Sequence, residues 1–215
     1  GVLRAPISGA LRGEVNEAGG LGQLSATLQI GAGALQPSDR SRPVPFDHAR
    51  SYFIYDPASQ MIRFDELSVD SAWGRGSAEG HAYLGGVESG QLQELIGQFT
   101  FSDLALNPND VYAAPLRLNR ADADFRLELA PFRLTLGQMY IEDATSGLSL
   151  AGALSADQAG WSLALDGQMA QISRDRLLDI WPEGLAAKPR AWIARNLKAA
   201  NLHGLNLALR VRPGT

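Results

Sequence analysis

The feature that most constrains the fold of this chain is a short-range alternation of apolar and polar residues. Four runs, Leu24–Ile30, Phe125–Leu129, Leu148–Leu150 and Trp161–Leu165, place an apolar side chain at every second position. A period of two is typical of a β-strand with one apolar and one polar face. The 23 glycines and 11 prolines fall mainly between such runs, as turn residues do. The sequence therefore predicts a mainly β protein.

A longer pattern recurs within these strands, with apolar residues at positions 1, 3, 6 and 8 of an eight-residue segment. The segments begin at Ile62, Phe99 and Leu134, with a looser copy from Ala200 that keeps Leu202, Leu205 and Leu207. Adjacent polar residues interrupt the period of two inside each segment. A β-bulge or bend at that point would return the later apolar side chains to the same face.

The spacing of these segments suggests repeated supersecondary units. Gly80 and Gly152 are 72 residues apart, as are Ile62 and Leu134. Equal offsets at several positions are typical of repeat architectures. The alternative is that strands of similar length in any antiparallel sheet give rough periodicities by chance.

Residues 173–198 differ from the rest and predict a helical hairpin. Ser173 is a good N-cap for a helix that stops at Pro182, and Pro189 suits the first turn of a second helix. Five apolar residues of this hairpin are candidates for packing on the sheet or docking a partner: Trp181, Leu185, Trp192, Ile193 and Leu197.

Composition excludes several classes of function. The net charge of −4 argues against non-specific nucleic-acid binding, and the absence of cysteine removes disulfides and thiolate sites. The three histidines lack metal-ligand spacing, so we expect no metal or other cofactor. No apolar stretch approaches the length of a membrane span. The chain begins at Gly1 with no signal peptide, so we expect it to be a piece of a longer protein.

No catalytic constellation is visible, and we expect no enzyme. Asp122 and Asp124 share a strand face, but solvated surface carboxylates explain them better than a hydrolase site does. Asp47, His48 and Ser51 are too close in sequence for the usual triad geometry. The basic residues comprise 17 arginines and two lysines. Codon composition explains this excess better than contact with phospholipid head groups at a groove rim.

The hairpin sequence resembles a signature of the AsmA-like bacterial envelope proteins, in particular the YhdP-like group, which is related to TamB. The resemblance rests on Arg176–Ala186, which contains Trp181-Pro182, and on Pro189–Leu197. Ile180 stands where an aromatic residue is common in that group. Upstream, the segment from Tyr55 to Val69 is also similar to the family, and the likeness extends over about residues 50–212.

This resemblance implies a fold, a function and a location. Proteins of this family are anchored in the inner membrane and extend through the periplasm as an elongated, U-shaped antiparallel sheet. Their apolar groove is thought to carry phospholipid toward the outer membrane. The chain would then hold repeated β units at 1–172, the helical hairpin at 173–198 and a returning strand at 199–215, with the anchor outside this fragment. Phospholipid is the expected partner, besides envelope proteins.

The residue pattern fits a lipid-shielding groove, because strands with every second side chain on one concave face supply continuous apolar cover. The candidate lining residues are Ile62, Phe64, Leu67, Val69, Phe99, Phe101, Leu104, Leu106, Leu134, Leu136, Met139, Ile141, Leu163 and Leu165. The same pattern would also build a closed β-sandwich, whose inner faces pack together. Under that alternative the chain is a protein-interaction module of the cell envelope that conducts no lipid.

Overall fold

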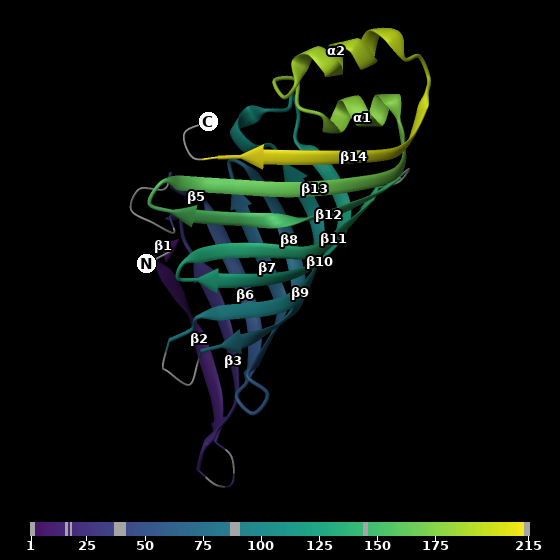
Figure 1. The fold of residues 1–215 in the computed structure, drawn as a ribbon. Helices are drawn as coiled ribbons and strands as arrows, with labels where there is room; N and C mark the ends of the chain where they lie inside the picture. Colours follow the sequence, from purple (N-terminus) through teal and green to yellow (C-terminus); the bar gives the residue numbers. More distant parts are fainter. Residues whose placement is uncertain are drawn as a thin grey trace.

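The computed structural model describes residues 3–15, 17, 19–36, 42–86, 91–143 and 146–212. Most of this chain is β-strand (Figure 1). The strands are β1 (Leu3–Arg4), β2 (Ile7–Val15), β3 (Leu21–Ile30), β4 (Gly33–Leu35), β5 (Val44–Phe46), β6 (His48–Asp56), β7 (Met61–Ser71), β8 (Gly74–Gly85), β9 (Glu94–Leu106), β10 (Leu116–Leu129), β11 (Phe132–Asp143), β12 (Ser146–Asp157), β13 (Gly160–Ser173) and β14 (Asn201–Val211).

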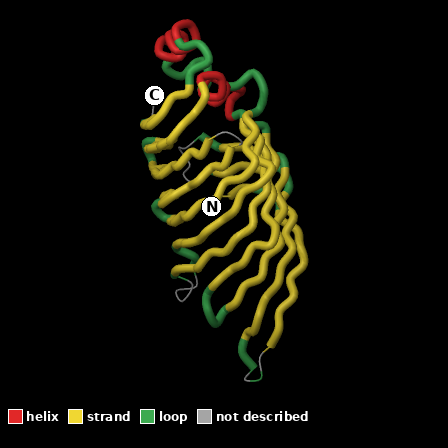
Figure 2. The backbone as a smooth tube through the Cα atoms, turned by 90° about the vertical axis from the view of Figure 1, so that its right-hand side faces the viewer, coloured by secondary structure: helices red, strands yellow, loops and turns green. Residues whose placement is uncertain are grey.

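Eleven strands form one open antiparallel sheet in the order β14-β13-β12-β11-β10-β9-β8-β7-β6-β3-β2. From β7 to β14 each strand pairs with the strand that precedes it in the sequence, so this part of the sheet is a meander, and β6 pairs with β3. A separate sheet of three short strands, β1-β4-β5, lies where β3 connects to β6. The predicted elongated antiparallel sheet is confirmed. The closed sandwich is not the architecture of the described chain, because the main sheet stays open and forms a single layer (Figure 2).

The predicted kinks are present inside the strands. The ladder of β7 shifts register between Phe64 and Leu67, and that of β11 shifts between Leu136 and Met139. In the other two segments the fifth position has a left-handed backbone: Asp103 has φ 54° and Gly204 has φ 64°. An extra or left-handed residue bends a strand and increases its twist. Each bend therefore re-aims the next apolar side chain and also curves the sheet.

The curved sheet forms a trough (Figure 1). Strands β12 to β14 make the wall nearest the viewer, and β6 to β8 lie behind it. A hydrogen bond connects β13 to the segment between β4 and β5. The indole Nε1 of Trp161, at the start of β13, donates it to the carbonyl oxygen of Arg42 over 2.9 Å. The two residues are 119 positions apart in the sequence.

Two helices follow β13, as the sequence predicts. Helix α1 (Arg174–Ile180) begins at Ser173, whose hydroxyl accepts a hydrogen bond from the amide of Arg176. Helix α2 (Ala187–Asn196) follows after a short turn, with Pro189 in its first turn. Strand β14 then returns along β13. Both helices lie within the predicted range 173–198, and β14 lies within 199–215. Of the predicted ranges, residues 1, 2, 16, 18, 37–41, 87–90, 144, 145 and 213–215 lie outside the described residues.

Candidate functional site: an apolar concave face

The strand register places apolar side chains on one continuous face of the sheet. Directly opposed residues in neighbouring strands share a face. Phe101 opposes Ala121 in β10 and Ala78 in β8, and Ala121 in turn opposes Ile141 in β11. Toward β14 the same row continues through Leu148 in β12, Met169 in β13 and Leu205 in β14. Toward β2 it continues from Ala78 through Leu67 in β7, Ser51 in β6, Leu28 in β3 and Gly9 in β2. Apart from Ser51, this row has no polar side chain.

The predicted lining residues all lie on this face. Those of β7 oppose small residues of β8, since Phe64 faces Gly80 and Val69 faces Gly76. Leu104 reaches the same face, because a Cβ at Gly76 would lie 2.5 Å from its Cδ2 atom. The remaining members follow from the cross-strand pairs of β9, β11, β12 and β13: Phe99, Phe101, Leu106, Leu134, Leu136, Met139, Ile141, Leu163 and Leu165, together with Ile62 and Leu67 of β7.

A row of phenylalanine rings crosses the middle of the face. Phe53, Phe64, Phe99 and Phe125 follow one another with ring centroids 5.8, 5.4 and 5.3 Å apart. Phe64 and Phe99 lie on β7 and β9, which β8 separates, and second-neighbour strands are about 9.5 Å apart. Their rings meet because the residue between them is Gly80. A Cβ there would lie 2.1 Å from the carbonyl oxygen of Gln98.

Gly152 repeats this arrangement 72 residues further on. It lies on β12 between Leu136 of β11 and Leu165 of β13. A Cβ at Gly152 would lie 2.1 Å from the carbonyl oxygen of Ala164. The equal offset seen in the sequence therefore corresponds to equivalent places on the same face.

The apolar face is concave and largely uncovered. Ala82 and Ala121 are fully buried in a sheet of one layer, which requires larger side chains to close over them from both sides. Side chains nearer one rim stay accessible, with Val69 41% and Leu106 37% exposed. The whole chain exposes 13304 Å², against about 9,600 Å² expected for a compact 23.0 kDa monomer. Apart from the two helices at one end, no second layer of the described chain lies over the face.

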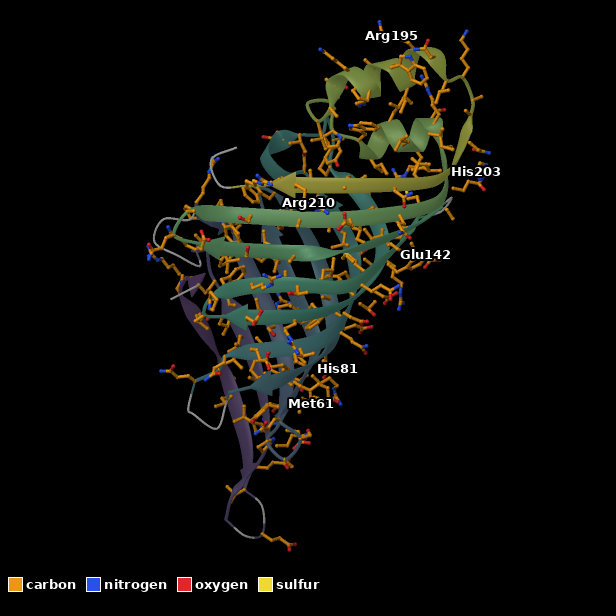
Figure 3. All side chains as sticks on the ribbon, in the orientation of Figure 1. Met61, His81, Glu142, Arg195, His203 and Arg210 are labelled. Atoms are coloured by element: carbon orange, nitrogen blue, oxygen red, sulfur yellow. The ribbon has the colours of Figure 1, made fainter. Side chains whose placement is uncertain are left out.

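The opposite, convex face is polar. His81 and Glu142 project outward from it (Figure 3). Arginines on this face pair with carboxylates of the same or neighbouring strands: Arg50 with Glu66, Arg63 with Asp65, Arg120 with Asp122, Arg126 with Glu94 and Arg210 with Asp166. These exposed pairs keep the convex face hydrated and add little stability each.

The two aspartates considered for catalysis lie on the convex face. Asp122 accepts hydrogen bonds from Arg120 and from the Thr100 hydroxyl. These bonds, that of Arg120 foremost, lower the pKa of Asp122 below its ordinary 3.8. A carboxyl group that donates a proton at neutral pH needs a raised pKa instead. Asp122 is therefore poorly suited to be a general acid.

The other polar candidates do not assemble either. His48 opposes Asp70 on the convex face, whereas Ser51 opposes Leu67 on the apolar face, so the two side chains point in opposite directions. A shallow hollow on the convex face is lined by residues of mixed charge, among them Arg63 and Glu79. No group of three or more His, Asp or Glu side chains within the described ranges is placed to hold a metal ion. None of the described helices is long and apolar enough to cross a membrane.

The helical hairpin covers one end of the apolar face. Leu177 of α1 joins Met169 and Ile172 of β13 in a buried cluster. Trp181 and Ile193 pack against that cluster, whereas Leu185 and Trp192 are 47% and 56% exposed. Of the five predicted hairpin residues, two therefore pack on the sheet, two face solvent, and Leu197 is half-buried.

Two side chains fix the hairpin in place. Arg190 of α2 donates to the carbonyl oxygens of Leu178 and Trp181, each at 3.0 Å, and so ties α2 to the end of α1. Tyr112, in the connection between β9 and β10, donates a 2.9 Å hydrogen bond to the carbonyl oxygen of Ile180. The hairpin thus spans the end of the trough from β13 to the β9–β10 connection (Figure 1).

The concave face also contains residues that the repeated sequence pattern did not predict. Alternate positions of β10 and β12 line the same face, and so do positions of β2, β3, β6 and β14: Ala121, Ala123, Phe125, Leu127, Leu148, Leu150, Leu154, Leu11, Ala26, Leu28, Phe53, Leu205, Leu207 and Leu209. The alternation was visible in several of these strands. It carries less weight where the inward residues are alanine and glycine, whose apolar area is small.

Comparison with protein-family models, with curated protein sequences and with solved structures gives no match. The functional argument therefore rests on the concave apolar face itself.

Proposed function

We propose that this chain is a segment of an AsmA-like protein of the bacterial periplasm whose concave face shields phospholipid acyl chains in transit between the inner and outer membranes. The observation that carries the proposal is the apolar row that continues from β2 to β14 with little of the chain over it. Resemblance of the Trp181–Leu197 region to the YhdP-like group supports the assignment to this family.

The energetics of moving a phospholipid explain why such a face is needed. Each methylene transferred from hydrocarbon to water costs about 0.8 kcal/mol, so exposing two acyl chains costs on the order of 20 kcal/mol. A conduit lowers this cost only where apolar surface follows the acyl chains without a gap. The Phe53–Phe125 row and the leucines of β11 to β14 supply such surface across the sheet.

The polar convex face also supports the proposal of a lipid-shielding groove. A sheet that buried both faces in protein would carry apolar residues on both. Here the ion pairs of the convex face mark it as a hydrated exterior, so water and hydrocarbon are separated by one layer of strands. The phospholipid head group would remain in water at the open side of the trough, while its acyl chains lie against the concave face.

Site-specific photocrosslinking tests this proposal directly. A photoreactive phenylalanine analogue replaces Phe101 on the concave face, or Ser102, the next residue on the same strand and exposed on the convex face. The chain is expressed in the periplasm as part of the protein that contains it. We expect phospholipid adducts at position 101 and none at position 102. Absence of lipid adducts at 101, or equal adducts at both positions, would contradict the proposal.

A further inference from the structure

Helix α2 carries an unusual concentration of positive charge. Both lysines of the chain, Lys188 and Lys198, lie in residues 184–199, together with Arg190 and Arg195 and no carboxylate. The chain as a whole has a net charge of −4. The acidic residues of the hairpin, Asp175, Asp179 and Glu183, all precede this stretch. Residues 184–199, which include helix α2, therefore carry four cations and no carboxylate, whereas α1 carries charges of both signs.

Helix α2 has an inner face that packs on the sheet and an outer face that is exposed. Ile193 points toward the sheet and packs on its buried cluster, and Arg190 is engaged with the carbonyl oxygens of α1. Lys188, Trp192 and Arg195 are spaced by four and three residues, so they share the opposite face of the helix. All three are exposed, Trp192 at 56%. A tryptophan thus lies on the outer face with a cation one turn away on either side.

This outer face is available for contact. Helix α2 is the outermost element at its end of the molecule, and Arg195 points away from the rest of the chain (Figures 1 and 3). Within the described chain, the ion pairs of the hairpin join Arg174 to Asp175 and Arg190 to Glu183, and none involves Lys188, Arg195 or Lys198. Lys188, Arg195 and Lys198 could therefore meet an external anion, with the Arg195 Nε also donating a hydrogen bond to the carbonyl oxygen of Ala191.

We propose that this surface, defined by Leu185, Lys188, Trp192, Arg195 and Lys198, docks on an anionic phospholipid bilayer. Amphipathic tryptophan side chains favour the bilayer–water interface, and interfacial helices place Lys and Arg toward anionic head groups. Charge complementarity selects this occupant, because residues 184–199 carry four cations and no carboxylate beside the exposed Leu185 and Trp192, and the preceding carboxylate, Glu183, is paired with Arg190. The inference is independent of whether the groove carries lipid, since it concerns the outer face of α2 alone.

Vesicle flotation with the purified chain tests the inference. Vesicles of phosphatidylcholine containing equal phosphatidylglycerol are compared with vesicles of phosphatidylcholine alone. We expect binding to the anionic vesicles that weakens as salt rises from about 0.1 M to about 1 M, because the Debye length falls from about 10 Å to about 3 Å. Replacing both lysines, Lys188→Gln with Lys198→Gln, lowers the partition coefficient by about thirtyfold, about fivefold for each cation. Trp192→Ala lowers it by about tenfold.

Matched variants distinguish the effect of the α2 surface from the effect of the chain's net charge. Arg50→Gln with Arg126→Gln removes the same charge from the convex face, and Tyr83→Ala removes an aromatic side chain that is 51% exposed there. Both controls are expected to bind anionic vesicles as the parent chain does. Equal binding to neutral vesicles, no binding at all, or equal losses in the lysine variant and its charge-matched control would overturn the inference.

Discussion

The hydroxyl of Tyr112 and the carbonyl oxygen of Ile180 are joined by a 2.9 Å hydrogen bond between two segments that are 68 residues apart in sequence. Burial raises the pKa of the Tyr112 hydroxyl, so the group stays protonated and donates at neutral pH. This bond connects the β9–β10 connection to the end of α1 across the end of the trough. It therefore helps to hold the hairpin on the side away from β13.

Removing this hydroxyl is expected to loosen the hairpin. Tyr112→Phe leaves the ring in place and leaves the Ile180 carbonyl without its donor, at a cost of about 1 kcal/mol. Hydrogen exchange followed by mass spectrometry should show faster exchange in residues 174–197 and unchanged exchange in β7 to β9. Unchanged exchange in the helices would show that the bond does not hold the hairpin.

The two equivalent glycines of the groove are expected to reject a side chain. Gly80→Ala and Gly152→Ala each place a Cβ 2.1 Å from a backbone carbonyl oxygen, so the backbone of two strands must shift. We expect each variant to lower the free energy of unfolding by about 1–3 kcal/mol, measured by urea denaturation.

Gly184→Ala is the matched control, because a Cβ at Gly184 meets no atom within 4 Å and lies in the turn between the helices. We expect its free energy of unfolding to match that of the parent chain within about 0.5 kcal/mol. Neutral behaviour of Gly80→Ala and Gly152→Ala would show that the close approach at these positions has no role in the fold.

The ion pair of Asp122 gives a pH dependence of defined sign. Its pKa is lowered in the folded chain, chiefly by hydrogen bonds from Arg120 and Thr100, below the ordinary 3.8. A lowered folded pKa stabilises the fold above the unfolded pKa, and this contribution is lost as the pH falls through the folded value. Asp122→Asn is therefore expected to be less stable than the parent chain at pH 7 and to converge with it below about pH 3.

The size of this effect is limited by solvent. The side chains of Arg120 and Asp122 are 54% and 47% exposed, so the loss at pH 7 should remain under about 1 kcal/mol. Urea denaturation at both pH values measures it. Arg120→Gln should also reduce the pH dependence, but less than Asp122→Asn does, because the Thr100 hydroxyl still donates to the carboxylate. A larger loss at pH 7, or one that grows as the pH falls, would contradict this assignment.

Local patterns predicted much of the fold. The alternation in β3, β10, β12 and β13 identified these strands. Two consecutive residues without an apolar side chain, Asp65-Glu66 in β7 and Gly137-Gln138 in β11, identified the bulges of those strands. Ser173 and Pro182 bounded α1 to within a residue or two, because capping and proline act on adjacent backbone groups. Each of these signals is contained within about ten residues of sequence.

Features that depend on distant residues could not be predicted in this way. The contact of Phe64 with Phe99 requires Gly80 between them on a third strand, and the bond of Trp161 to Arg42 requires the curvature of the whole sheet. The division of the hairpin into packed and exposed tryptophans was also undetermined, since both Trp181 and Trp192 occupy apolar positions of similar local pattern. The direction of each side chain depends on the tertiary contacts of its helix.

Native mass spectrometry of the chain purified from cells without detergent tests the lipid-shielding groove most directly. The parent chain and Ser102→Asp, whose new carboxylate lies on the convex face opposite Arg120, are expected to carry phospholipid adducts. Phe101→Asp and Leu136→Asp put a carboxylate into the half-buried apolar face and are expected to lose them while keeping the β circular dichroism of the parent. Lipid-free parent protein, or equal adducts in all four proteins, would contradict the account, as would unfolding of both groove variants, which would make these positions structural core.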